Sequence, residues 1–204
     1  TEMRDRVEDN VRFQLTQQGL DDKPDDPSSL DEDTASLVEA IELEAVDGNS
    51  WNDGFEQYVT SVGYTIVNRL AALRCMEVRD FIDEEVTVFK ENGLTPAAET
   101  LVHEEFLLED EAILEAYHRA CETLAEEIEI LFDRSSAYSL VDPDDDTFEE
   151  LCEMLDSVPD EVWRADDVLG WVYEYYNVKL LDDLRRKGDR EGLDPEDVPA
   201  ANQF

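Results

Sequence analysis

The 204-residue chain is long enough for one domain, or for two small domains that share a core, and its 42% apolar and 9% aromatic residues exclude wholesale disorder. Asp and Glu number 55 against 16 Lys and Arg, which gives a formal net charge of -39. This charge excludes a nucleic-acid binder that acts through a net basic surface, because such proteins displace phosphate counterions with Lys and Arg.

No segment approaches the roughly 18 apolar residues of a membrane span and no signal peptide opens the chain, so the sequence predicts no membrane partner. The three cysteines, Cys75, Cys121 and Cys152, are widely spaced and odd in number. This usage is typical of buried thiols in a reducing compartment. It predicts a cytoplasmic protein without a disulfide framework.

The acidic residues extend from Glu2 to Asp197 instead of forming one block, and arginine far outnumbers lysine among the basic residues. A protein adapted to molar salt has such a carboxylate surface, because concentrated salt shortens the screening length to about 3 Å and makes the self-repulsion tolerable. A functional acidic mimic of nucleic acid is the alternative. We favour a halophilic origin, in which case the charge says little about the partner.

The apolar periodicity predicts helices and almost no strand, so the expected fold class is all-α, an irregular multi-helix bundle. Helices are predicted over 3–20, ending at Gly19, and over 34–46, with an acidic linker at 21–33 between them. Ser50 and Asp53 form a capping-box pattern that opens the longest helix. The apolar stripe of that helix consists of Phe55, Tyr58, Val59, Val62, Ile66, Leu70 and Leu73.

Thr95 followed by Pro96 is a start signal for helices that run to about residue 132, with a break near 108–111. A turn at 142–146 then precedes a helix that Thr147 is expected to cap, and a last helix is predicted to begin near 166. We divide the chain into two parts. Residues 1–50 hold the N-terminal helices and the acidic linker, and residues 51–204 form a helical domain.

The sequence contains no motif for catalysis. No glycine pair has the GxG spacing of a phosphate-binding loop, and no HExxH is present. His118 has Glu115, Cys121 and Glu122 near it in the helical repeat, a spacing that a metal ion could use. In so acidic a helix such neighbours arise by chance, and we predict no catalytic residue, no cofactor and no metal in this chain.

Two segments are unusual for core helices. Residues 64–78 form the least acidic stretch of the chain and set Asn68, Arg69 and Arg74 into a strongly apolar helix. An arginine there must find a carboxylate or carbonyl partner, or reach a phosphate-bearing ligand. We expect the three side chains at the edge of the core, beside the apolar stripe. Residues 168–177 contain four aromatic side chains within six positions, which is typical of core packing.

The same two segments resemble a known family. Residues 64–78 resemble the AYTWFNRLIALRFMEV helix of the large adenine-specific DNA methyltransferases of the PglX type, which belong to BREX phage-defence systems and are related to restriction-modification enzymes. Residues 169–177 resemble the family's IGWLYQYYN segment. Residues 196–204 are similar to ENIPAATQLF, which in that family directly precedes the methyltransferase fold. The resemblance covers about residues 51–204, and only part of the family pattern is kept just after residue 177.

The resemblance implies a parent enzyme that methylates adenine at N6 with S-adenosylmethionine. This chain has neither the glycine-bearing cofactor loop nor the [DN]-P-P-[YF] motif that holds the flipped adenine. We therefore interpret it as an N-terminal helical region that is not catalytic by itself and precedes a missing methyltransferase domain.

Two functions follow from the resemblance. In the first, the region helps to position DNA or the catalytic domain of the same chain. In the second, it is a protein-protein adaptor that docks other defence-system proteins and never contacts DNA. Arginines clustered on one face would favour the first, and arginines buried against carboxylates would favour the second or a plain structural role. The candidate DNA or interdomain contacts are Asn68, Arg69, Arg74, Trp171, Tyr175, Tyr176, Arg185 and Arg186.

Overall fold

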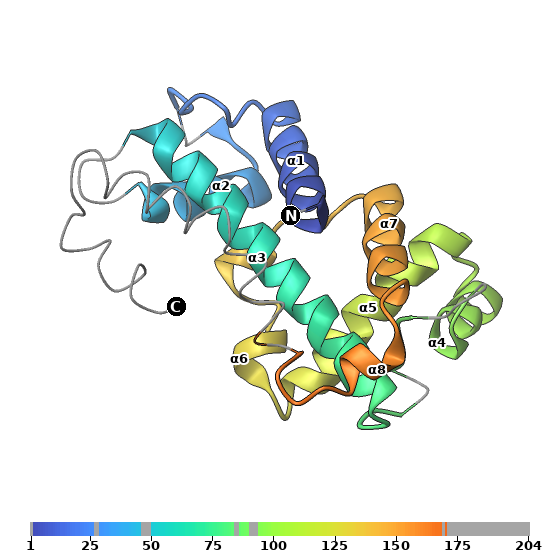
Figure 1. Ribbon diagram of the computed structural model, residues 1–204. Coiled ribbons are helices and arrows are strands. Elements are labelled where there is room, and N and C mark those ends of the chain that lie inside the picture. Colours follow the sequence, from blue (N-terminus) through green and yellow to red (C-terminus); the bar gives the residue numbers. More distant parts are fainter. Residues whose placement is uncertain are drawn as a thin grey trace, which may run out of the picture.

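The structure is a computed structural model that describes residues 2–26, 29–45, 50–83, 86–89, 94–168 and 170. Within these residues the regular elements are helices and no strand is present, so the predicted all-α fold class is confirmed. None of the described helices is both long enough and apolar enough to cross a membrane. Figure 1 shows the helices arranged around one long central helix, α3.

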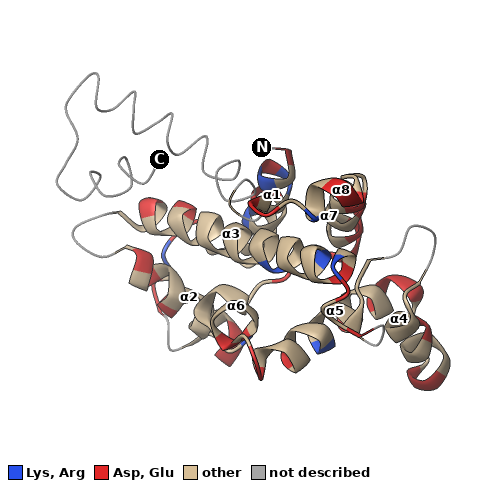
Figure 2. Ribbon diagram, turned by 60° about the horizontal axis from the view of Figure 1, so that its bottom comes forward, with Lys and Arg blue, Asp and Glu red and all other residues tan. Residues whose placement is uncertain are grey.

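Helix α3 spans Trp51–Val78 and begins where the capping box predicts. The Ser50 hydroxyl accepts a hydrogen bond from the Asp53 N–H at 3.2 Å, and the Asp53 carboxylate accepts one from the Ser50 N–H at 3.0 Å. Every residue of the predicted apolar stripe is buried. Other helices pack on more than one side of α3, so Val67 and Ala71 outside that stripe are buried too. Figure 2 shows few charged residues along the middle of α3.

Helices α1 (Glu2–Gln17) and α2 (Glu32–Glu44) pack against α3. The end of α1 is followed by Gly19, whose φ of 75° is a left-handed conformation that glycine adopts without strain. The carboxylate of Asp31 caps α2 by accepting a hydrogen bond from the Thr34 N–H at 3.0 Å. Helix α2 crosses α3 closely at Gly54, where an added Cβ would lie 2.6 Å from the Cβ of Ala45. A side chain at residue 54 would therefore push the two helices apart.

The next elements are α4 (Pro96–Thr100), the π-helical turn η4 (Leu101–Glu105), α5 (Glu109–Ala125) and α6 (Glu129–Phe132). Thr95 caps α4 as predicted, with its hydroxyl accepting from the Ala98 N–H at 3.3 Å. The break between η4 and α5 falls at residues 106–108, which overlaps the expected position near 108–111 at its first residue. A small second core joins α4 and η4 to α5; its buried members are Ala98, Leu101, Ala112 and Ala116.

The chain continues with the 3-10 turn η5 (Ala137–Ser139), α7 (Asp145–Asp156) and α8 (Asp160–Trp163). The prediction that Thr147 caps α7 is wrong. The cap is Asp144, whose carboxylate accepts from the Thr147 N–H at 2.9 Å, and a carboxylate there also faces the positive end of the helix dipole. The short α8 was not predicted, and the last helix expected from residue 166 lies mostly outside the described residues.

Most of the buried apolar side chains form one continuous core that extends from Val7 on α1 to Val168. Helices α1, α2 and α3 all contribute to this core, and the division of the chain at residue 50 stays a prediction. Cys75 and Cys121 are buried, and all three thiols are free.

Candidate functional site

Arg69 lies in the middle of α3, and only 3% of the residue is exposed. Its Nε donates to the Leu131 carbonyl at 2.7 Å, and its Nη2 donates to the Asp133 carbonyl at 2.6 Å. Both acceptors lie at the C-terminal end of α6, where a helix has unpaired carbonyls and the negative end of its dipole. The expectation that Arg69 lies at the edge of the core is wrong, because its guanidinium is used inside the fold to cap α6.

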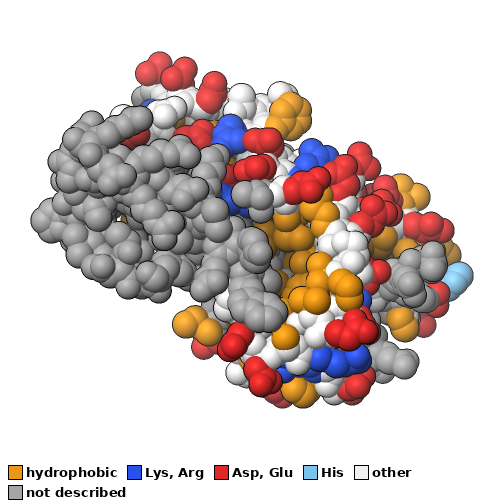
Figure 3. Space-filling model, in the orientation of Figure 1, with side chains coloured by type: hydrophobic (Ala, Val, Ile, Leu, Met, Phe, Trp, Pro, Cys, Tyr) orange, Lys and Arg blue, Asp and Glu red, His pale blue; other side chains and the backbone are white. Residues whose placement is uncertain are grey.

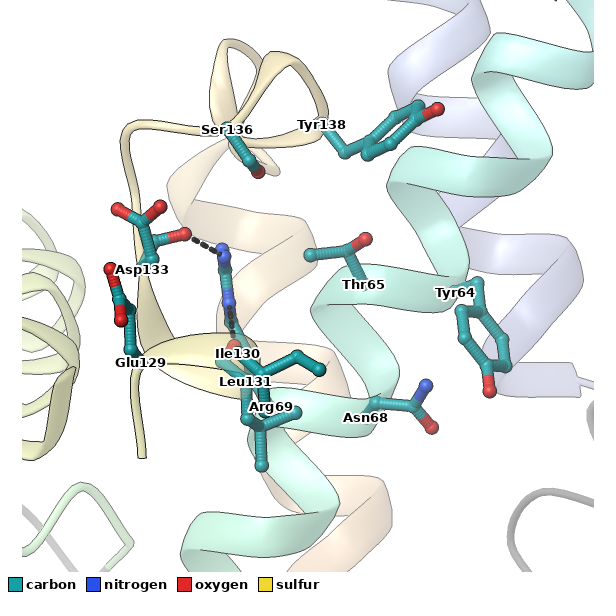
Figure 4. Close-up of a pocket in the computed structure, with 10 residues that line it drawn as sticks. All are labelled: Tyr64, Thr65, Asn68, Arg69, Glu129, Ile130, Leu131, Asp133, Ser136 and Tyr138. Atoms are coloured by element: carbon teal, nitrogen blue, oxygen red, sulfur yellow. Dashed lines mark hydrogen bonds between the residues drawn. The ribbon is translucent and has the colours of Figure 1, made fainter. Parts of the chain in front are cut away.

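Arg69 lies beside a groove of about 510 Å³ between α3, α6 and η5. Figure 4 shows its guanidinium directed at the end of α6, while Asn68 and Tyr64 point away from that guanidinium. Arg69 is the only cation among the lining residues, and Glu129 and Asp133 add carboxylates. The groove is therefore unsuited to a phosphate group. Its lining residues are Tyr64, Thr65, Asn68, Arg69, Glu129, Ile130, Leu131, Asp133, Ser136 and Tyr138.

Arg74 lies further along α3 in a cluster of carboxylates, and its side chain is 14% exposed. Its Nη2 lies 2.7 Å from Oδ1 of Asp156 on α7 and 3.3 Å from Oδ1 of Asp160 at the start of α8. The guanidinium also lies over the ring of Phe89, 5.7 Å from the ring centroid. Arg74 thus connects α3 to α7 and α8. Its pairing with carboxylates is the arrangement expected of an arginine with a structural role.

Glu77 occupies the interior of the same cluster. One carboxylate oxygen, Oε1, accepts hydrogen bonds from the backbone N–H groups of Val88 and Phe89 and so holds this extended segment against α3. The other oxygen, Oε2, is buried without a hydrogen-bond partner, 3.9 Å from Nη1 of Arg74. Burial raises the pKa of Glu77 to about 7, although the two N–H groups and Arg74 act in the opposite direction.

The raised pKa predicts that the stability of this chain falls as the pH rises. Between an unfolded pKa of 4.5 and a folded pKa of about 7 the folded state binds more protons, so the free energy of unfolding decreases across this window. The shift corresponds to roughly 3 kcal/mol. Glu77→Gln should remove most of this dependence, measured by urea unfolding between pH 5 and pH 8 at constant high salt. The same substitution at the exposed Glu122 controls for net charge, and an unchanged pH slope in Glu77→Gln would contradict this assignment.

Two further arginines join the C-terminal ends of α3 and α8. The Arg79 guanidinium donates to the Trp163 carbonyl at 3.0 Å and to the Ala165 carbonyl at 2.6 Å. In return, Nη2 of Arg164 donates to the Val78 carbonyl at 3.0 Å. The C-terminal end of each helix is therefore capped by an arginine from the other helix. The negative end of a helix dipole stabilises a cation in this position.

The remaining basic side chains of the described residues also have partners within the fold. Arg134 makes a two-point contact with Asp142, at 3.0 and 2.8 Å, and Arg119 does the same with Glu105. Arg4, Arg6, Arg12 and Lys23 pair with Glu8, Glu150, Glu56 and Glu42. Every described arginine and lysine thus faces a carboxylate or a carbonyl of this chain.

His118 lies beside Asp142 and beside Glu115, which is one of the three neighbours that the sequence spacing gave. Its Nε2 lies 3.0 Å from Oδ2 of Asp142, and its Nδ1 lies 3.5 Å from Oε2 of Glu115. Burial alone would raise the pKa of Asp142, yet His118 and Arg134 hold that pKa well below its ordinary value. Among the described residues no group of His, Cys, Asp and Glu has the arrangement of a metal site.

The structure places three of the sequence-predicted site residues on α3, where Asn68 and Arg69 line the same groove and Arg74 does not. Asn68 lines the groove, Arg69 caps α6, and Arg74 joins the carboxylate cluster. Arg79 and Arg164 complete this region and were missed, because their partners are distant in sequence and no local pattern marks them. The remaining candidates, Trp171, Tyr175, Tyr176, Arg185 and Arg186, lie outside the described residues.

The described residues thus define an all-helical module whose basic side chains pair with carboxylates or carbonyls of the same chain. No family model matches the chain, and no solved structure matches it significantly. The chain is similar to the adenine-specific methyltransferase BrxX of Escherichia coli O9:H4 (strain HS), with 30% identity over 174 residues. The match covers 74% of this chain and 14% of the E. coli protein, so the chain spans about one seventh of that relative. The similarity supports a relationship to a family of BREX methyltransferases.

Proposed function

We propose that this chain is the N-terminal helical, non-catalytic region of a site-specific DNA adenine-N6 methyltransferase of the BREX or restriction-modification kind, and that it positions the catalytic domain. The observation that carries this proposal is the similarity to BrxX, which extends over most of this chain and a small part of the relative. The parent would bind S-adenosylmethionine and DNA through its catalytic domain, and would act in the cytoplasm, where its DNA substrate is found.

The pairing of the arginines supports positioning of a domain over direct contact with DNA by the described residues. A phosphate that bound Arg74 or Arg134 would have to displace Asp156 or Asp142, and a phosphate at Arg69 would have to displace two helix-end carbonyls. The high density of surrounding carboxylates opposes each exchange. A direct DNA contact by this chain would therefore involve basic residues outside the described part of the chain, among them Arg185 and Arg186.

The alternative function, an adaptor that docks other defence-system proteins, is favoured by the same paired arginines together with exposed apolar side chains such as Phe106 and Ile130.

The two functions differ in which activity or partner the parent protein loses when this region is removed. We expect a parent protein that lacks residues 1–204 to retain S-adenosylmethionine binding and to lose adenine methylation if the region positions the catalytic domain. Unimpaired methylation by the shortened protein, with loss of a partner from the purified complex, would support the adaptor instead.

The isolated 204-residue chain should not bind S-adenosylmethionine, because it contains no glycine-bearing loop for the cofactor and no proline pair for adenine. Isothermal titration at high salt should show only the heat of dilution, while the full-length parent should give a saturable isotherm. Saturable binding by the isolated chain would mean that part of the catalytic domain lies within these 204 residues.

A further inference from the structure

Phe106 combines two unfavourable features at the turn between η4 and α5. Its φ of 60° and ψ of 30° place it in the left-handed region at the C-terminal end of η4, where glycine or asparagine is the usual residue. Its side chain is 86% exposed, and that of Leu108, two residues later, is 65% exposed. A bulky residue in this conformation is strained. The isolated chain gains no core packing from Phe106 in return for that strain.

Other exposed apolar residues do not share this combination. The second non-glycine residue with a positive φ among the described residues is Asp80, and aspartate tolerates the left-handed region. Leu43 on α2 is as exposed as Leu108, but it lies within a regular helix. A strained and solvent-exposed aromatic residue is a candidate contact for a partner, because only binding would bury its ring.

The turn is held rigidly in place. Glu105, the last residue of η4, accepts two hydrogen bonds from Arg119 of α5, at 2.7 and 2.8 Å, and Arg119 also donates to Glu115 at 2.8 Å. The backbone N–H of Leu108 donates to the Glu111 carboxylate at 3.2 Å. The second core lies beneath the turn and fixes η4 against α5. A contact presented this rigidly loses little conformational entropy when it binds.

The charged residues around this turn indicate the charge that a partner surface must carry. Arg119, which binds Glu105, lies beside the turn, whereas Glu104 and Glu105 precede the turn and Glu109, Asp110 and Glu111 follow it, so that carboxylates outnumber basic groups here. Figure 3 shows hydrophobic side chains among acidic ones at the edge of the molecule where α4 lies. DNA and a second copy of this chain would both be repelled by these carboxylates. The complementary surface is an apolar pocket framed by arginine or lysine side chains.

We propose that Phe106 and Leu108, here called the Phe106 corner, dock into a basic-rimmed apolar pocket on the methyltransferase domain of the parent protein. This inference rests on the proposed function. A DNA-binding catalytic domain must carry a basic surface to neutralise phosphates, so it offers a charge opposite to that of the carboxylates around the corner. The ring of Phe106 would be the central apolar anchor of the contact, and the surrounding carboxylates would form its charged rim.

The test uses Phe106→Asn in the full-length parent, because asparagine tolerates the left-handed backbone and removes the ring. In the 204-residue chain this variant should not lower the Tm, since strain is relieved and no core contact is lost. Hydrogen exchange of the peptide that contains residues 101–108 should be slower in the full-length wild-type protein than in the 204-residue chain. In full-length Phe106→Asn the exchange should return to the rate of the 204-residue chain, and adenine methylation should fall about tenfold. Leu43→Ser removes another exposed apolar side chain, from α2, and should change neither readout.

Equal exchange at residues 101–108 in the full-length protein and the 204-residue chain would overturn the docking surface, and so would full protection in Phe106→Asn. Failure of the proposed function gives a different result. If the full-length protein does not methylate adenine and Phe106→Asn still exposes the 101–108 peptide, the corner docks as inferred but the domain it contacts is not a methyltransferase.

Discussion

Replacing Arg69 with alanine should lower the free energy of unfolding by about 3 kcal/mol, because the Leu131 and Asp133 carbonyls at the end of α6 would lose their donors and a space would open beside α3. Each buried carbonyl left without a donor costs roughly 1–3 kcal/mol, and water that enters from the adjacent groove offsets part of that cost. Urea unfolding of the 204-residue chain at high salt measures the difference.

Asn68→Ala is the matched control for Arg69→Ala. Asn68 is the preceding residue on α3, it is partly exposed in the groove, and its replacement should change stability by no more than about 0.5 kcal/mol. Arg69→Lys should recover part of the loss, since one ammonium keeps the charge at the end of α6 but cannot reproduce the planar two-point geometry. If Arg69→Ala unfolds like the wild type and the full-length protein loses DNA affinity, Arg69 contacts DNA and the capping role is wrong.

Lowering the salt concentration should unfold the chain, which is the largest change we expect. A net charge of -39 makes the folded state repel itself, and the screening length grows from about 3 Å in molar salt to about 30 Å in dilute buffer. Circular dichroism should show full helical content in about 2 M KCl, with most of it lost at about 0.01 M. This result is expected of a protein from a halophile, the origin that we propose from its composition.

Sucrose separates screening from general stabilisation in the salt experiment. Excluded osmolytes strengthen apolar burial without screening charges, so sucrose at matched osmolality should restore much less helix than KCl if repulsion is the cause. A cooperative thermal transition with full helical content in dilute buffer would contradict the proposed salt adaptation. The acidic composition would then require another explanation, such as mimicry of nucleic acid.

Local sequence determines much of this fold, because the signals involved act within one or two helical turns. Ser50 with Asp53, Thr95 with Pro96, and Gly19 mark helix ends that the structure confirms. The apolar stripe of α3 predicts the central element, and every member of it is buried. Asp144 was missed as a cap because three Asp residues and Thr147 stand in a row at 144–147, and a local rule does not rank them when each is an acceptable N-cap.

Tertiary structure alone decided the roles of the arginines. From the sequence, Arg69 could face a carboxylate, a carbonyl or a phosphate, and its partners at Leu131 and Asp133 lie more than sixty residues away. The mutual capping by Arg79 and Arg164 depends on how the ends of α3 and α8 meet. The partners of an arginine side chain depend on which groups the fold brings near it. A capping box or an apolar stripe, by contrast, lies within one segment of the chain. For this reason the sequence by itself determined the longer helices and their order, and packing determined which charged side chains hold them together.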